Sequence, residues 1–126
     1  MKKIIKTSAA PEPIGPYNQA ILVNGTLYTS GQIAIDPESG NLILDDIEKE
    51  TTCVMKNLKA VLAKANMTFE NVIKSTIYLS DMESFSKVNE IYGSYFNEET
   101  APARETVAVA TLPKSVNVEI SVVAIK

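Results

Sequence analysis

The chain has 126 residues, of which 45% are hydrophobic and 21% are charged, so it can bury the core of one domain but is too short for two ordinary ones. Its formal charge of −3, from 12 Lys and Arg against 15 Asp and Glu, disfavours a protein that mainly binds nucleic-acid backbones. Without His and with one cysteine, Cys53, the chain has no His-based dyad, no Cys-only zinc site and no internal disulfide. We expect one domain over residues 1–126 that is cytoplasmic, outside the membrane and free of metals and cofactors.

The N-terminal part of the chain predicts extended segments joined by turns. Residues 9–16 contain three prolines, which favour a stiff extended segment over a helix. Two β-prone runs, residues 19–23 and 26–30, flank Asn24 and Gly25. An Asn-Gly pair in this position predicts a hairpin, because both turn residues need a positive φ. A further short strand at residues 3–6 is optional.

A long amphipathic helix is predicted after a turn at residues 36–40. Apolar residues then recur at steps of three and four between residues 47 and 65, which is the period of a helix with one buried face. Asp45 or Asp46 can cap its start, and Glu48 is spaced for a capping box with Asp45. Asn66 suits the C-terminal end of the helix.

The second half of the chain alternates strands with one more helix. Residues 72–79 are rich in β-branched side chains and predict a strand. An aromatic stripe over residues 85–96 predicts a second helix, capped by Asp81 or Ser84. Residues 104–110 and 116–125 predict the last two strands.

This order of elements predicts an α+β domain in which one mixed sheet carries two helices on one face. Every second residue of the final strand, from Val116 to Ala124, is apolar and would pack under the helices. The opposite face of that strand is half apolar and has no helix to cover it. A small protein commonly buries such a face against a second copy, so we expect a homo-oligomer.

The candidate chemistry centres on one cation and one carboxylate. Arg104 is the only guanidinium in the chain and either binds a carboxylate or phosphate or forms an ordinary salt bridge. Glu119 lies in an apolar strand, where burial would raise its pKa and suit it to proton transfer. An ion pair between Arg104 and Glu119 at an interface, without catalytic meaning, is the alternative.

Four further residues are candidates for the lining of a binding site. Thr106 shares the strand face of Arg104, although β-propensity alone accounts for a threonine there. Tyr17 follows the rigid Pro16 and is either a site residue or an interface or core aromatic. Gly31 either allows a close approach to a ligand or marks a bulge, and Asn89 is either a buried polar anchor or reaches a pocket.

Several short motifs together are similar to those of the YjgF/YER/Rid family. The similarity runs in one register from about Ile14 to the C-terminus. The motifs are Ile14-Gly15-Pro16-Tyr17-Asn18-Gln19-Ala20, Ser30-Gly31-Gln32-Ile33, Asn57-Leu58-Lys59-Ala60-Val61-Leu62, Val88-Asn89-Glu90-Ile91-Tyr92, Pro102-Ala103-Arg104, Leu112-Pro113-Lys114 and Val118-Glu119-Ile120. The resemblance implies a chorismate-mutase-like fold, a six-stranded sheet and a homotrimer whose sheets form a central barrel, with ligand clefts between subunits.

The resemblance also implies hydrolysis of 2-iminobutanoate and 2-iminopropanoate to 2-oxo acids and ammonia, without a cofactor. Arg104 would then hold the substrate carboxylate, and Glu119 would handle water and protons. The remaining candidates, Tyr17, Gly31, Asn89 and Thr106, would line the cleft. A metabolite-binding or regulatory trimer is the main alternative, and a ribonuclease or translation inhibitor fits the acidic charge less well.

This sequence departs from the family pattern next to Arg104. Glu105 and Thr106 stand where many deaminating members have Ser and Cys, and Thr111 stands where an Arg is frequent. By strand alternation the side chain of Glu105 should point away from that of Arg104. We expect these differences to affect rate or substrate preference.

Overall fold

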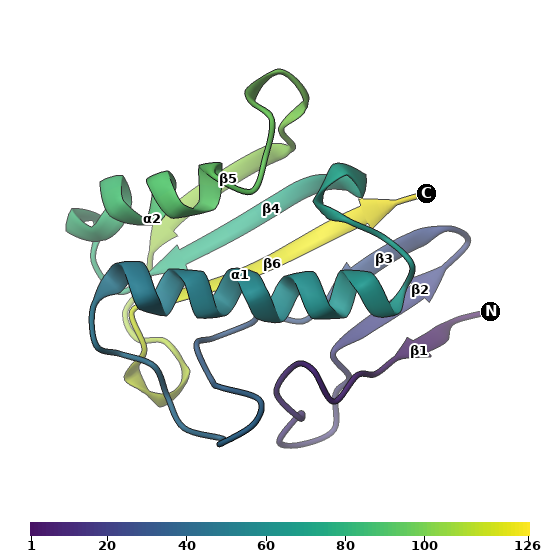
Figure 1. Ribbon diagram of the computed structural model, residues 1–126, viewed down its shortest axis with the longest axis horizontal. Coiled ribbons are helices and arrows are strands. Elements are labelled where there is room, and N and C mark those ends of the chain that lie inside the picture. The colour runs from purple at the N-terminus through teal and green to yellow at the C-terminus, as the bar shows by residue number, and fades with distance from the viewer.

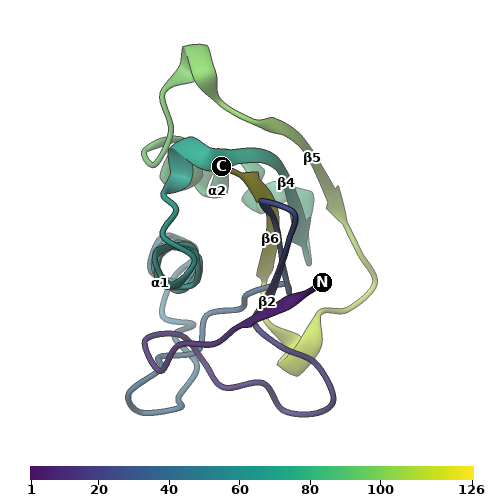
Figure 2. The same ribbon diagram turned by 90° about the vertical axis from the view of Figure 1, so that its right-hand side faces the viewer.

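Six strands form one mixed sheet, and both α-helices pack on the same face of it (Figure 1, Figure 2). The computed structural model describes residues 1–126. The elements are β1 (Lys3–Ile5), β2 (Ala20–Val23), β3 (Thr26–Thr29), α1 (Ile47–Lys64), β4 (Val72–Leu79), α2 (Phe85–Gly93), β5 (Ala103–Ala108) and β6 (Val118–Ile125). The strand order is β1-β2-β3-β6-β4-β5, with β4 and β5 parallel and all other pairs antiparallel. The predicted α+β architecture, with two helices on one face of a six-stranded sheet, is confirmed.

The hairpin between β2 and β3 forms where the sequence predicted it. Asn24 and Gly25 have φ values of 49° and 80°, and Val23 pairs with Thr26 across the turn. Most predicted strands begin or end one or two residues from the observed bounds, a difference typical of element ends. The last strand begins at Val118, two residues later than predicted, after the tight turn Pro113–Ser115.

Helix α1 lies across the sheet and supplies much of the core. Its residues Val54, Met55, Leu58, Val61 and Leu62 are fully buried against the sheet, as their helical spacing predicted. Asp46 is the N-cap, and its carboxylate accepts a hydrogen bond of 2.7 Å from the backbone N–H of Lys49. The predicted capping box from Asp45 was therefore wrong, although Asp46 was the stated alternative.

Helix α2 is shorter than predicted and ends at Gly93. Tyr95 and Phe96 follow it in a tight turn, yet both rings still pack on Phe69, with ring centroids 5.3 Å apart in each pair. The prediction that the aromatic stripe packs on the core is thus correct, but Tyr95 and Phe96 contact the core from residues that follow the helix. Asp81 caps the short 3-10 turn Met82–Ser84 rather than α2, and Ser84 makes no capping bond.

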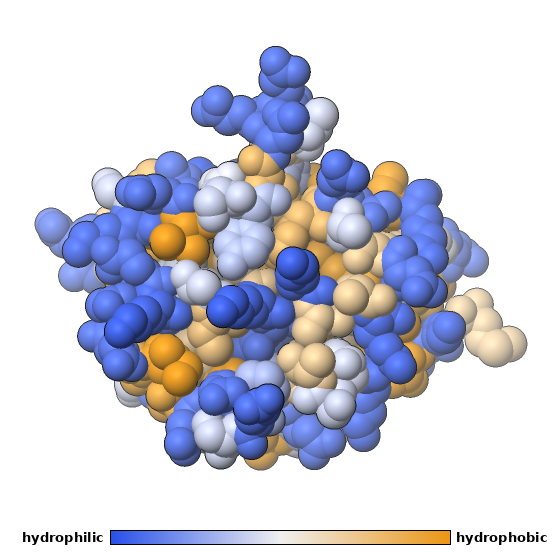
Figure 3. Space-filling view, in the orientation of Figure 1, coloured by the Kyte–Doolittle hydropathy of each residue, from blue (hydrophilic) through white to orange (hydrophobic).

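The central strand, β6, shows the alternation that the sequence predicted. Val118, Ile120, Val122 and Ala124 are buried under the helices. The other face of the sheet has no helix over it, and there Tyr28 and Val107 are 52% and 45% exposed. The outer surface of the helix-bearing side is instead mostly hydrophilic (Figure 3). Neither helix combines the length and apolar character needed to cross a lipid bilayer.

Candidate functional site

The predicted site residues other than Thr106 line two pockets of similar size. The Arg104 pocket, about 380 Å³, is lined by Asn89, Tyr92, Gly93, Phe96, Glu98, Ala101, Pro102 and Arg104. The Glu119 pocket, about 400 Å³, is lined by Pro11, Glu12, Pro13, Ile14, Tyr17, Gln19, Ser30, Gly31, Gln32, Ile33, Ile35, Pro113, Lys114 and Glu119. Each volume suits a small organic molecule.

Arg104 is held in a defined position although it is exposed. Its Nη1 donates a hydrogen bond of 2.6 Å to Oδ1 of Asn89. The guanidinium carbon also lies 5.1 Å from the ring centroid of Tyr92 and 5.6 Å from that of Phe85, within the range of cation–π attraction. Arg104 makes no salt bridge within the chain, so its remaining N–H groups can bind an anion.

The pocket also depends on Tyr92, which the sequence placed only on the core stripe. Its hydroxyl donates a 2.7 Å hydrogen bond to the buried Ser75 of β4, and burial raises its pKa. Tyr92 thus fixes the aromatic surface under Arg104. Asn89 is exposed and binds Arg104, so the alternative of a buried polar anchor was wrong.

Thr106 lies on β5 but lines neither pocket. Its hydroxyl oxygen is buried and has no hydrogen-bond partner within the chain. Such a group costs free energy unless a partner reaches it. Glu105, as predicted, points the other way and forms a 2.7 Å ion pair with Lys74.

The carboxylate of Glu119 lies beside Gly31 in the second pocket. Gln32 pairs with Ile120 through two backbone hydrogen bonds of 2.8 and 3.1 Å, which brings the 30–32 segment alongside β6. Glu119 has no hydrogen-bond or ion-pair partner within the chain, and desolvation by burial raises its pKa. A carboxylate with a raised pKa is suited to exchange protons near neutral pH.

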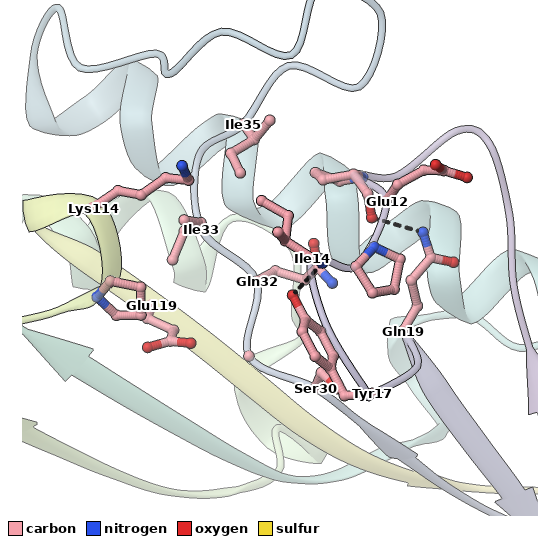
Figure 4. Close-up of a pocket in the computed structure, with 14 residues that line it drawn as sticks. Glu12, Ile14, Tyr17, Gln19, Ser30, Gln32, Ile33, Ile35, Lys114 and Glu119 are labelled. Carbon is pink, nitrogen blue, oxygen red and sulfur yellow. Dashed lines mark hydrogen bonds between the residues drawn. The ribbon is translucent and has the colours of Figure 1, made fainter.

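An N-terminal arm, residues 7–17, forms the opposite wall of the Glu119 pocket. Figure 4 shows the ring of Tyr17 on one side and the carboxylate of Glu119 on the other. Gln19, 2% exposed, anchors this arm by donating hydrogen bonds to Thr7, Ala10 and Pro11 and accepting one from the Thr7 N–H. Gln19 belongs to the Ile14–Ala20 motif, but nothing in the sequence predicted that it anchors this arm.

Arg104 and Glu119 lie on opposite faces of the sheet. Arg104 pairs with Ser75, whose buried hydroxyl faces α2, whereas Glu119 pairs with Tyr78 on the face without helices. The two side chains therefore cannot meet within one chain, so an Arg104–Glu119 ion pair, the alternative given above, would have to join two subunits. One subunit carries two separate halves of the predicted site.

A methyl group at Gly31 would displace Glu119. A Cβ at this position would lie 2.8 Å from Cδ and 2.9 Å from Cγ of Glu119, closer than van der Waals contact allows. Since the obstacle is the end of a flexible side chain, we expect Gly31→Ala to fold and to lower by about tenfold the rate of any reaction that uses the Glu119 carboxylate, because small displacements of reacting groups are costly. Steady-state kinetics check this. In a Glu119→Gln background, Gly31→Ala should lower the rate little further. An equal loss of rate in both backgrounds would contradict the idea that Gly31→Ala acts by displacing Glu119.

Cys53 lies outside both pockets, on α1. Its thiol is half-buried, and its pKa is raised mainly by desolvation and further by Asp36. A raised pKa lowers the thiolate fraction, so Cys53 is not an activated nucleophile. No group of three or more Cys, Asp and Glu side chains is placed to hold a metal ion.

Comparison with known proteins identifies relatives over the full chain. The family model described as "Endoribonuclease L-PSP" matches residues 7–126. The human 2-iminobutanoate/2-iminopropanoate deaminase is 44% identical over 126 residues, covering 100% of this chain and 91% of the relative. A Rid-family protein of unknown function from Yersinia pestis has a TM-score of 0.97 at 48% identity, covering 100% of both chains. E. coli TdcF, solved with bound serine, has a TM-score of 0.92 at 36% identity, covering 98% of each.

Proposed function

Because the chain belongs to the YjgF/YER/Rid family, whose family model is that of endoribonuclease L-PSP, we propose that it hydrolyses small 2-imino acids to 2-oxo acids and ammonia. The substrates proposed are 2-iminobutanoate and 2-iminopropanoate, named for the human relative that is 44% identical.

The observation that carries the proposal is the state of Arg104. Its guanidinium is fixed by Asn89 and by two aromatic rings, yet it has no acidic partner in the chain. This arrangement suits paired hydrogen bonds to a planar carboxylate, because the donors are already oriented before the ligand binds. The bound serine of TdcF, a small carboxylate compound, supports a ligand of this class.

Glu119 is proposed to handle the protons of the reaction. Its carboxylate takes a proton from a water molecule as the oxygen bonds to the imine carbon, and it returns that proton to the nitrogen, which gives a tetrahedral carbinolamine. The carboxylate then takes the proton of the new hydroxyl group and passes it to the amine, so that ammonia leaves as the C–N bond breaks and the C=O bond of the 2-oxo acid forms. An imine carbon is already electrophilic, so positioning and one carboxylate with a raised pKa suffice.

The two halves of the site are proposed to meet between subunits of a homotrimer. The Arg104 pocket of one chain would face the Glu119 pocket of its neighbour, with Tyr17 and Gly31 on the Glu119 side. Exposed apolar side chains on the sheet face without helices, including Ile4, Tyr28 and Val107, supply a surface that association would bury.

The experiment that tests the function generates the imine substrate enzymatically within the assay. Threonine dehydratase releases 2-iminobutanoate, which semicarbazide traps as an adduct that absorbs light. The protein should suppress the adduct in proportion to its concentration while 2-oxobutanoate and ammonia accumulate in equal amounts. Under the alternative, a metabolite-binding or regulatory trimer, suppression would stop at one equivalent per site.

The charge of the pockets favours a small anion over an RNA backbone. Each pocket combines one cation with at least one carboxylate: Arg104 with Glu98, and Lys114 with Glu12 and Glu119. A surface that tracks phosphates needs several cations without interposed acids. RNA binding with a steep salt dependence would contradict this interpretation.

Mixed trimers should recover activity that neither parent has. Arg104→Ala and Glu119→Gln damage different halves, so about one site in three of every mixed trimer should combine an intact half from each variant. Co-expression with two affinity tags, followed by the imine assay on doubly tagged trimers, measures this recovery. Doubly tagged trimers as inactive as the parents would show that Arg104 of one chain and Glu119 of its neighbour do not share a site.

A further inference from the structure

Glu50 is a fully buried carboxylate that the proposed reaction leaves without a role. It lies on α1 with 0% exposure and has no cationic partner. A buried charge is costly, and an apolar side chain of similar size would fill the same space more favourably. The acid at this position therefore calls for an explanation beyond core packing.

All three hydrogen bonds that Glu50 accepts come from the two residues before Glu119. Its Oε2 accepts from the backbone N–H of Asn117 at 2.7 Å and from that of Val118 at 3.2 Å, and its Oε1 accepts from Nδ2 of Asn117 at 2.8 Å. The helix α1 is thereby joined directly to the first residue of β6. No other side chain binds these two backbone N–H groups.

The segment that Glu50 holds follows a strained turn. Lys114 and Ser115 are consecutive non-glycine residues with positive φ values, 55° and 56°. Such conformations persist only where the surrounding structure enforces them. Beyond the turn, the Glu50 contacts anchor Asn117 and Val118, and the Gln32–Ile120 pairing anchors the next part of β6. Glu119 lies between these two anchors.

We propose that Glu50 is a positioning residue that fixes the start of β6, so that the carboxylate of Glu119 stays beside Gly31 and points into its pocket. The inference rests on the proposed function of Glu119. Its structural basis is the tight fit at Gly31, where a methyl group would overlap the Glu119 side chain. A strand start that shifted by a fraction of an ångström would move Glu119 out of this position.

The test compares three variants. Glu50→Leu removes every acceptor and leaves the N–H groups of Asn117 and Val118 without partners. Glu50→Gln keeps one acceptor oxygen for these N–H groups and should preserve the position of Glu119. Thr51→Val is the matched control, because Thr51 is equally buried on the same helix but bonds only to Ile47 of that helix.

Two measurements report on the position of Glu119. The first is its carboxyl titration by ¹³C NMR, assigned by loss of the signal in Glu119→Gln. Burial raises the pKa of Glu119 in the native chain, and Glu50→Leu should return it toward the ordinary value as the side chain becomes solvated. The charged and titratable groups around Glu119 are Glu12, Tyr17, Lys114 and Tyr78, and all of them are retained in these variants.

The second measurement is steady-state kinetics in the imine assay. Glu50→Leu should lower kcat at least tenfold while KM stays within about twofold, because the Arg104 pocket lies on the other face of the sheet. Glu50→Gln and Thr51→Val should keep both values close to those of the native chain. A folded Glu50→Leu protein with an unchanged Glu119 titration would overturn the proposal.

Asn117→Ala keeps the proposal testable if Glu50→Leu does not fold. It removes only the side-chain amide from the contact, at a half-buried position, and should give a smaller change of the same kind in both measurements. No change in either would count against Glu50 as a positioning residue. If the native chain hydrolyses no imine, the proposed function fails, and the NMR titration alone still decides whether Glu50 positions Glu119.

Discussion

Replacing Arg104 by alanine is expected to lower kcat/KM for 2-imino acids by about 10²–10³-fold. The guanidinium is the only group in its pocket that can hold a carboxylate by paired, charge-assisted hydrogen bonds, and such a contact is worth about 2–4 kcal/mol. We expect KM to rise and kcat to fall, because the hydrogen bonds from Arg104 to the carboxylate also orient the imine carbon toward water. The semicarbazide competition assay measures it.

Arg104→Lys should recover only part of this activity. A lysine keeps the charge, but it cannot form two parallel hydrogen bonds and would lose the stacking on Tyr92 and Phe85. Lys87→Ala is a matched control, because it removes one positive charge from the same helix as Asn89 without touching either pocket. If Lys87→Ala lost as much activity as Arg104→Ala, general electrostatic attraction would replace the specific clamp as the explanation.

The fold should tolerate the loss of Arg104. The side chain is exposed, and its contacts to Asn89 and the two rings are worth about 1 kcal/mol or less in such a setting. A thermal midpoint within a few degrees of the native chain would therefore accompany the loss of activity, and the proposed trimer should still assemble.

Glu119→Gln is expected to lower kcat by about 10²–10³-fold with little change in KM. The amide is nearly isosteric but can neither accept a proton from water nor return it, and proton transfer by a positioned group contributes about this much. Glu90→Gln, an exposed position on α2 outside both pockets, serves as the control. An active Glu119→Gln enzyme would assign proton transfer to another group.

The pH profile gives a second signature of Glu119. Desolvation raises its pKa above 4.5, so the acidic limb of the native kcat/KM profile should lie above that pH, and Glu119→Gln should lack this limb. Although Glu119→Gln lowers activity, it should not lower the stability of the fold. Above the folded pKa the native chain carries a partly desolvated charge that the amide removes, so the variant should be at least as stable at pH 7. This advantage should vanish as the pH falls below the unfolded pKa. Denaturant unfolding at several pH values checks the sign.

The sequence predicted the elements well because their signals are local. The Asn24–Gly25 pair specifies its own turn, and the apolar spacing of α1 and the alternation of β6 depend only on residues a few positions apart. The bounds of α2 were less accurate, because Tyr95 and Phe96 continue the apolar pattern after the helix has ended at Gly93. Tertiary packing, rather than helical propensity, holds those two rings.

The sequence indicated most of the residues of the candidate site, but it did not indicate how they are arranged in space. Arg104 and Glu119 stand out by residue type, whereas their placement on opposite sheet faces follows from the pairing of both strands with β4. The close fit of Glu119 on Gly31 and the contacts of Gln19 and Glu50 join residues far apart in the chain. Periodicity carries no information about such contacts.

The order of strands in the sheet also has a consequence for how the chain folds during synthesis. β6 is the last element in the chain, yet it lies between β3 and β4 and pairs with both. Until the ribosome releases β6, the β1–β3 meander and the parallel β4–β5 unit have no strand to join them, and their inner edges stay open. Closure of the sheet is therefore a late, non-local event, and the nascent chain must keep two unpaired edges from aggregating until β6 emerges.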